Sequence, residues 1–154
     1  MFEKIKQWLE AEGIDFRVVH HAPTHTSEES AAARGESLAV GGKAIVIKVD
    51  EGFKLFVLSA SLKVDSSKIK ARFGAKKLRF ASAEELLELT GLVPGSVPPL
   101  GLPILTLDLF VDESIVRNDS IAFNAGSLTD SIIMTTKDYL RVAKPEVFAF
   151  SKSE

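Results

Sequence analysis

Apolar residues recur at helical spacing in several parts of the chain, and the first such part opens the sequence. Its apolar helical face consists of Phe2, Ile5, Trp8 and Leu9. Gly13 can end this helix. Capping boxes predict the start of two more helices, since Thr26 is followed by Glu29 and Ser82 by Glu85. The further predicted helices lie within residues 26–35, 65–74, 82–91 and 137–144.

Strands are predicted where apolar and β-branched residues alternate with polar ones or run together. The clearest is a hairpin over residues 41–60, whose turn is supplied by Asp50, Glu51 and Gly52. The other predicted strands cover residues 14–20, 77–80, 104–111, 120–125 and 130–136. Helices and strands are interspersed, yet some strands are adjacent hairpin partners. This order predicts an α+β fold with a mixed or antiparallel sheet.

Composition limits the classes of protein that remain. With 154 residues, 45% of them hydrophobic and 26% charged, the chain is expected to form one free-standing globular domain over residues 1–154. It has no cysteine, which excludes disulfides, thiolate nucleophiles and cysteine metal sites and is compatible with a cytoplasmic location. The N-terminal segment is charged and amphipathic, unlike a signal peptide, and no apolar run is long enough to span a membrane. The formal net charge of −2 predicts that any RNA binding uses a local patch.

Two lysines on one predicted strand are candidate functional residues. In "KAIVIKV", Lys43 shares a face with Ile45, while Lys48 falls on the opposite face with Val46. One of these ammonium groups therefore faces the interior side of the sheet. That placement is costly unless the group is paired or opens into a polar pocket. The alternative is that Lys43 lies at the strand edge and reaches water.

Other candidates are weaker. His20, His21 and His25 cluster at a strand end, but without cysteines they favour a solvated loop over a metal site, so no metal or other cofactor is expected. The segment "KIKARFGAKKLRF" is a positive stripe without acidic residues. It indicates either phosphate binding or a solvated helix face. The RNA-binding candidates in it are Lys68, Lys70, Arg72, Lys76 and Lys77.

The segment "GLVPGSVPPLGLP", residues 91–103, is stiff and apolar, which is unusual for a loop. Together with "THTSEESAAARG", "KAIVIKV" and the segment from Val111 to Val142, it resembles the YbaK/prolyl-tRNA-synthetase-associated family of aminoacyl-tRNA editing domains. The resemblance covers nearly the whole chain. It implies a mixed, barrel-like sheet surrounded by helices. It also implies hydrolysis of the ester that joins a wrong amino acid to the terminal adenosine of a tRNA, with help from the tRNA's own ribose hydroxyl.

The resemblance also implies roles for individual residues. It assigns Lys43 as the functionally important lysine and Gly95 and Gly101 as backbone donors to the ester carbonyl. The pocket walls that it implies consist of Thr26, Ser96, Val97, Pro98, Pro99, Leu100, Asn124, Ala125, Gly126 and Ser127. Family members that edit alanine carry a histidine-proline motif where this chain reads "FNAGSLT", so the amino-acid specificity is left open. Asp112 is a weaker candidate for a substrate contact, and a role in a turn or as a helix cap is favoured for it.

Three hypotheses follow from the sequence. The first is a trans-acting aminoacyl-tRNA deacylase in which rigid backbone amides stabilise the oxyanion and Lys43 binds a phosphate or polar substrate group. The second is a non-catalytic module of the same fold that binds tRNA or a nucleotide. The third is a protein recruited as a partner by an aminoacyl-tRNA synthetase. The sequence does not decide the amino acid, the tRNA or the oligomeric state.

Overall fold

The computed structural model describes the whole chain, Met1–Glu154, and its longest strands are those of the predicted hairpin. The strands β2 (Gly42–Val49) and β3 (Gly52–Ser59) pair in antiparallel register, with Val49 opposite Gly52. β5 (Leu78–Phe80) adds to the free edge of β2, while β6 (Leu109–Asp112) and β9 (Glu146–Phe148) add in parallel beyond β3. The result is a mixed five-stranded sheet in the order β5-β2-β3-β6-β9.

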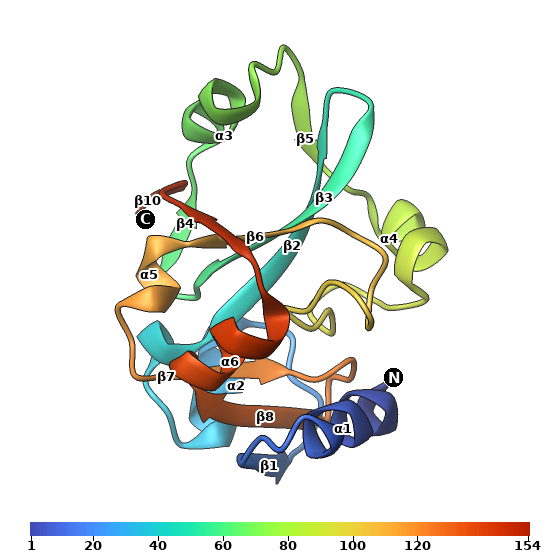
Figure 1. Ribbon diagram of the computed structural model, residues 1–154, viewed down its shortest axis with the longest axis vertical. Coiled ribbons are helices and arrows are strands. Elements are labelled where there is room, and N and C mark those ends of the chain that lie inside the picture. The colour runs from blue at the N-terminus through green and yellow to red at the C-terminus, as the bar shows by residue number, and fades with distance from the viewer.

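Two smaller sheets complete the strand structure. β1 (Phe16–His20), β8 (Asp130–Thr135) and β7 (Ser120–Asn124) form an antiparallel sheet at one end of the molecule (Figure 1). β4 (Leu62–Val64) pairs only with β10 (Ser151–Ser153). No sheet closes on itself, so the α+β class with mixed sheets is confirmed but the expected barrel-like closure is wrong. Closure depends on strand registers between distant segments, which the hydrophobic pattern of single strands does not fix.

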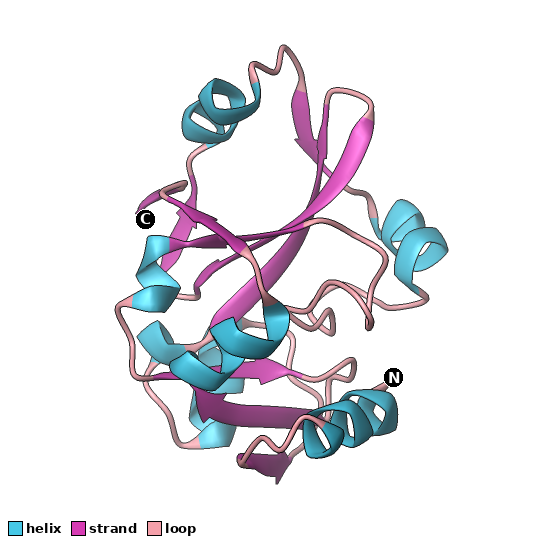
Figure 2. Ribbon diagram, viewed as in Figure 1, coloured by secondary structure: helices cyan, strands magenta, loops and turns pink.

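Six α-helices lie around these sheets (Figure 2). They are α1 (Phe2–Ala11), α2 (Ser27–Arg34), α3 (Ser66–Phe73), α4 (Ala83–Thr90), α5 (Glu113–Val116) and α6 (Thr136–Ala143). Both predicted capping boxes are present, at Thr26 before α2 and at Ser82 before α4. Asp112 caps α5 through Ser114, as its interpretation as a helix cap requires. None of these helices has the length and apolar character needed to cross a bilayer.

Two apolar clusters hold the layers together. The larger includes α1, α6, the inner faces of β7 and β8, and much of the Gly/Pro segment, and its fully buried members include Leu100, Phe123 and Tyr139. The smaller lies on the other side of the long hairpin and is rich in phenylalanine. There the Phe56 ring stacks on Phe110 with centroids 5.4 Å apart. Residues 96–101 in the middle of this segment are therefore part of the core and not a free linker.

Two glycines bring the end of the long hairpin against the three-stranded sheet. Gly41 forms an isolated parallel bridge with Ala122, and a Cβ atom on Gly42 would lie only 2.7 Å from Ile121 Cδ1. A side chain at Gly42 would thus push the two sheets apart. A neighbouring backbone therefore lies close to the start of β2. It places Lys43 at the junction of the two sheets.

The structure departs from the predicted strands within residues 104–111 and at three short strands. Residues 104–111 were expected to form one strand, but only Leu109 onward does so, because the Gly101 carbonyl accepts hydrogen bonds from the amides of Ile104 and Leu105 and forms a turn. The three-residue strands β4, β9 and β10 were not predicted. Each pairs with a segment distant in sequence, so local periodicity carries no signal for it.

Candidate active site

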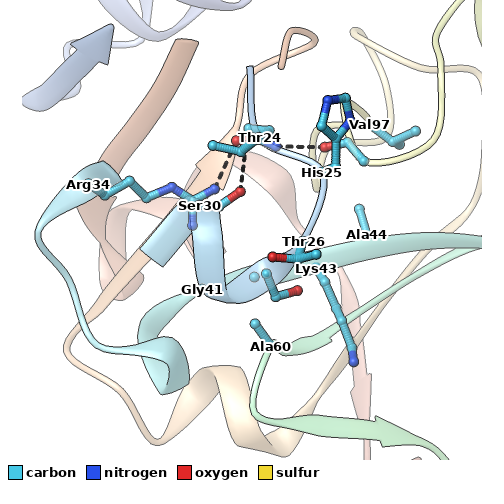
Figure 3. Close-up of a pocket in the computed structure, with 14 residues that line it drawn as sticks. Thr24, His25, Thr26, Ser30, Arg34, Gly41, Lys43, Ala44, Ala60 and Val97 are labelled. Carbon is cyan, nitrogen blue, oxygen red and sulfur yellow. Dashed lines mark hydrogen bonds between the residues drawn. The ribbon is translucent and has the colours of Figure 1, made fainter. Parts of the chain in front are cut away.

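A small polar pocket of about 120 Å³ opens at this junction (Figure 3). Its walls come from the loop before α2 and α2 itself, the start of β2, the turn after β3, the Gly/Pro segment and the end of β7. The lining residues are Thr24, His25, Thr26, Ser27, Ser30, Arg34, Gly41, Gly42, Lys43, Ala44, Ala60, Gly95, Val97 and Asn124. Four parts of the chain thus converge on one cavity: residues 24–34, the long hairpin, the Gly/Pro segment and the end of β7.

The side chains that line the pocket include cationic groups but no acidic ones. It contains hydroxyl groups and two cationic side chains, Lys43 and Arg34, but no aspartate or glutamate. Thr24 and Ser30 are both buried, and their hydroxyl oxygens lie 2.8 Å apart. Such a pocket favours neutral or anionic groups and disfavours a cationic side chain.

Lys43 is the member of the predicted lysine pair that faces the pocket. Its side chain is 26% exposed, and its Nζ atom lies 3.8 Å from Oε1 of Glu154. Lys48 lies outside the pocket, with its Nζ atom 5.6 Å from the centroid of the Phe53 ring. The only acidic partner of Lys43 is thus an exposed glutamate outside the pocket, which an anionic ligand can replace.

The Gly/Pro segment is held rigidly at two carbonyl groups. Asn124 Nδ2 donates to the Gly95 carbonyl at 2.7 Å, and the buried Tyr139 hydroxyl donates to the Pro99 carbonyl at 2.6 Å. Gly95 has φ +87°, a conformation that favours glycine. The amides of Gly95 and Val97, both at the pocket wall, donate to no acceptor within the protein. Two backbone N–H groups on a fixed loop are therefore available to a ligand oxygen.

Arg34 is a pocket residue that sequence analysis missed. It occupies the last turn of α2 and is 8% exposed. Its Nε atom donates to Ser131 Oγ at 2.9 Å and its Nη2 atom to Asn124 Oδ1 at 3.0 Å. Its position four residues after Ser30, on the same helical face as Ala31, was the signal that could have identified it as an inward-facing charge.

The charge of Arg34 is held in an unfavourable environment. Burial lowers the pKa of its guanidinium group to about 10, and the more distant Glu36 only partly offsets this effect. Arg34 still carries its charge at neutral pH. Its hydrogen-bond partners, Ser131 and Asn124, are neutral, so Glu36 alone supplies an opposite charge and compensates only in part for the desolvation.

The structure brings together part of the predicted site. Thr26, Lys43, Gly95, Val97 and Asn124 all line the pocket. The Thr26 hydroxyl also accepts the hydrogen bond from the Glu29 amide that caps α2. The roles of these residues in binding or catalysis remain predictions. Their convergence is a fact of the fold.

The remaining predicted site residues lie outside this pocket. Ser96, Pro98, Pro99 and Leu100 are buried behind its wall. Gly101 is packed so tightly that a Cβ atom would lie 2.9 Å from the Leu107 carbonyl oxygen. The rest belong to the end of β7 and the turn that leads to β8: Ala125 is fully buried, Gly126 lies under Met1, and Ser127 donates to Asp130.

The other candidate groups are also separated. His20 contacts Asp130, His21 lies 2.9 Å from Ser131 Oγ, and His25 lines the pocket, so the three histidines do not converge. The basic stripe follows α3 and β5 at the end of the molecule opposite α2 and β7 (Figure 1). Within it, Arg72 pairs with Glu146 at 3.2 Å.

Comparisons with known proteins show the family of the chain. The family model of the aminoacyl-tRNA editing domain matches residues 21–142. The chain is 39% identical over 150 residues to the multifunctional Ser/Thr-tRNA deacylase ProXp-y of Escherichia coli (strain K12), covering 94% of this chain and 89% of that protein. It is 35% identical over 106 residues to a proline–tRNA ligase of Bacillus licheniformis, covering 69% of this chain and 18% of the ligase.

Solved structures show the same relationship. The crystal structure of a putative trans-editing enzyme for prolyl tRNA synthetase superimposes with a TM-score of 0.85 at 27% identity, covering 99% of this chain and 97% of that one. The match of the family model covers most of the chain and includes every residue that lines the pocket. The chain therefore belongs to the family of aminoacyl-tRNA editing domains.

Proposed function

We propose that this protein hydrolyses the ester bond of mischarged aminoacyl-tRNA. The observation that carries the proposal is the pair of unbonded amides, Gly95 and Val97, on a rigid loop that faces a small pocket beside Lys43. An ester carbonyl oxygen seated there meets two donors that need no rearrangement. The 39% identical relative from Escherichia coli, a Ser/Thr-tRNA deacylase by name, supports the same reaction.

The chemistry requires little from side chains. A water molecule attacks the ester carbonyl carbon, and the negative charge that develops on the carbonyl oxygen is stabilised by hydrogen bonds from the Gly95 and Val97 amides. The carbon–oxygen bond to the ribose then breaks, and the ribose oxygen takes up a proton. The products are a free amino acid and a tRNA with a free hydroxyl. Removal of one such donor in other enzymes costs about 2.7–4 kcal/mol.

Lys43 supplies positive charge at the edge of the pocket. We propose that it binds a phosphate or polar group of the terminal adenosine, replacing its contact with Glu154. Lysine suits this role because its ammonium group acts as a compact point charge. Gly101, the second amide donor that the family resemblance implies, is then assigned to packing of the loop, with Val97 in its place at the pocket.

We propose serine and threonine esters as substrates. The cavity of about 120 Å³ fits a small side chain, and its buried hydroxyl groups match a polar one. Large aromatic or cationic side chains do not suit its size or its positive charge. The relative's name points to the same two amino acids.

We place the phosphate-binding surface beside the pocket, on β4 and β10. Lys63 and Lys152 are directly opposite each other in this two-stranded sheet, and neither has an acidic partner. Like charges in this position are mutually unfavourable and are relieved by a bound polyanion. A second hollow of about 230 Å³ on this side is bordered by Lys68, Arg117 and Lys152, together with the acidic residues Asp112 and Glu113. The other members of the predicted stripe, Lys70, Arg72, Lys76 and Lys77, remain a more distant candidate surface.

We propose that residues 1–154 act as a free-standing editing unit on tRNA released by a synthetase. The match to part of a proline–tRNA ligase supports the idea that the same unit also works beside a synthetase active site. Recruitment by an aminoacyl-tRNA synthetase is therefore a further proposal. Co-purification of the full chain with a synthetase tests it.

Hydrolysis of a panel of mischarged tRNAs tests the main proposal. We expect the wild-type protein to release serine or threonine and Lys43→Ala to lose most of this activity. Tight, salt-sensitive tRNA binding without release of any amino acid would instead identify a non-catalytic tRNA-binding module. If the protein neither binds tRNA nor releases an amino acid, the assignment of editing activity to this chain is overturned.

A further inference from the structure

One nitrogen atom of Arg34 has no partner within the protein. While Nε and Nη2 donate to Ser131 and Asn124, Nη1 is directed toward Gly41 and makes no hydrogen bond. An ideal Cβ atom on Gly41 would lie 3.5 Å from Nη1. Because Gly41 has no side chain, no Cβ atom covers Nη1 at this position, and both residues line the pocket. Figure 3 shows the Arg34 guanidinium group beside Ser30 at this wall.

The stability of the fold does not explain this arrangement. Arg34 is 8% exposed and has neutral hydrogen-bond partners, and the lining of the pocket contains no carboxylate. A buried charge without an opposite charge is unfavourable, and an apolar side chain of similar volume is often tolerated better. A ligand that accepts a hydrogen bond from Nη1 would stabilise the buried guanidinium group.

The groups around Nη1 define the kind of ligand. On one side, Arg34 supplies N–H donors and a positive charge. On the other, the Thr24 and Ser30 hydroxyls, 2.8 Å apart, include one that can still donate or accept. A hydroxyl group on the ligand can accept from Nη1 and donate to Thr24 or Ser30. A methyl group in the same place leaves these polar groups unpaired, which carries a large penalty in a buried site.

We infer that Arg34, Thr24 and Ser30 form the side-chain subsite of the pocket and that Arg34 selects aminoacyl esters that carry a β-hydroxyl group. This inference rests on the proposed deacylase function and assigns its substrate specificity to particular residues. Arg34 then contacts the substrate side chain and leaves the ester carbonyl to Gly95 and Val97. Loss of Arg34 changes the choice of amino acid more than the hydrolytic step.

The test compares substrates that differ by one hydroxyl group. Deacylation of seryl- and alanyl-tRNA, and of threonyl- and valyl-tRNA, is measured for the wild type, Arg34→Met, Arg34→Lys and Ser30→Ala. The control is Arg17→Lys, because Arg17 is an exposed arginine that pairs with Glu36 at 2.7 Å outside the pocket. Circular dichroism and thermal unfolding show which variants are folded.

We expect Arg34→Met to lower the ratio of kcat/KM for serine over alanine by about tenfold or more, because the value for serine falls much further than the value for alanine. Arg34→Lys should retain part of the ratio, and Arg17→Lys all of it. If Arg34→Met does not fold, the test uses Ser30→Ala, for which we expect a smaller decrease in the ratio of kcat/KM for serine over alanine. Parallel losses for both substrates would show a structural role and overturn the inference, as would faster cleavage of aspartyl-tRNA than of seryl-tRNA by the wild type. A wild type that cleaves none of these esters would refute the proposed function itself.

Discussion

The amide group of Asn124 connects Arg34 to the backbone of Gly95. Its Oδ1 atom accepts from Arg34 Nη2 at 3.0 Å, and its Nδ2 atom donates to the Gly95 carbonyl at 2.7 Å. A buried cation on α2 and a backbone loop some sixty residues later are thus fixed to each other by one side chain on β7. This contact fixes the loop that lines the pocket at Gly95 and Val97.

Replacing Asn124 by aspartate tests this connection with a change of one atom. The aspartate keeps an acceptor for Arg34 but presents a second oxygen to the Gly95 carbonyl, which repels it. We expect kcat to fall by about tenfold or more on every cleaved ester, since the oxyanion donors lose their position. The measurement is kcat and KM on seryl- and alanyl-tRNA. A selective loss on seryl-tRNA would place Asn124 in the side-chain subsite instead.

The two glycines of the loop should respond differently to alanine. Gly95 has φ +87°, and an added Cβ atom would meet only Leu128 Cδ2 at 3.4 Å. Gly95→Ala should therefore alter the loop and reduce deacylation by about tenfold or more while costing only about 1–2 kcal/mol of stability. Gly101→Ala places the Cβ atom 2.9 Å from a backbone oxygen and should mainly lower the unfolding midpoint. Urea unfolding and deacylation rates are measured for both variants. If the two variants lose the same stability, the two glycines do not differ in role as predicted.

In the proposed mechanism, Glu154 competes with the substrate for Lys43. The two side chains lie 3.8 Å apart, and the glutamate is 60% exposed, so their contact is weak and easily displaced. We expect Glu154→Gln to lower KM for aminoacyl-tRNA by about twofold at low salt and Lys43→Met to raise it by about tenfold or more. Steady-state kinetics at two salt concentrations measure both effects. An unchanged KM in Lys43→Met would remove Lys43 from phosphate binding.

Charge reversal can locate the face that receives the tRNA. The double variant Lys63→Glu, Lys152→Glu reverses two cations on β4 and β10, beside the pocket. The matched variant Lys70→Glu, Lys76→Glu makes the same change of net charge on the predicted stripe. We expect only the first to raise KM by about tenfold and to make the salt dependence of binding shallower. If only Lys70→Glu, Lys76→Glu raises KM, the tRNA binds at α3 and the predicted basic stripe is the binding surface.

Local signals explain which parts of the fold and site were predictable. Thr26 and Ser82 predicted helix starts because a capping box is complete within four residues, and the long hairpin followed from its turn residues and alternation. The strand β10 was not predicted because its register, with Lys152 opposite Lys63, depends on a contact across most of the chain. The pocket was predicted in part, from Lys43 and the Gly/Pro segment. Arg34 was not predicted as a pocket residue because an arginine in the last turn of a helix ordinarily points to solvent.

Asp112 gives the fold a dependence on acid that is independent of the active site. Its carboxylate is 1% exposed and accepts hydrogen bonds from the Ser114 amide at 3.0 Å and the Phe150 amide at 2.7 Å. Burial alone would raise the pKa of this group, but the hydrogen bonds from Ser114 and Phe150 outweigh it and hold the pKa below the ordinary value of 3.8. Because the native state favours the ionised form, the contribution is complete well above the ordinary value. It is lost as the pH falls through the lowered pKa.

Replacing Asp112 by asparagine should therefore destabilise the protein at neutral pH and have less effect in acid. We expect a loss of about 1–3 kcal/mol in the free energy of unfolding at about pH 7, since hydrogen bonds to a charged acceptor are replaced by weaker ones. The difference from the wild type should shrink below about pH 4. Urea unfolding of both proteins at a series of pH values measures it. A gap that stays constant down to about pH 3 would mean that packing around Asp112, and not its charge, joins β6 and α5 to the C-terminal segment.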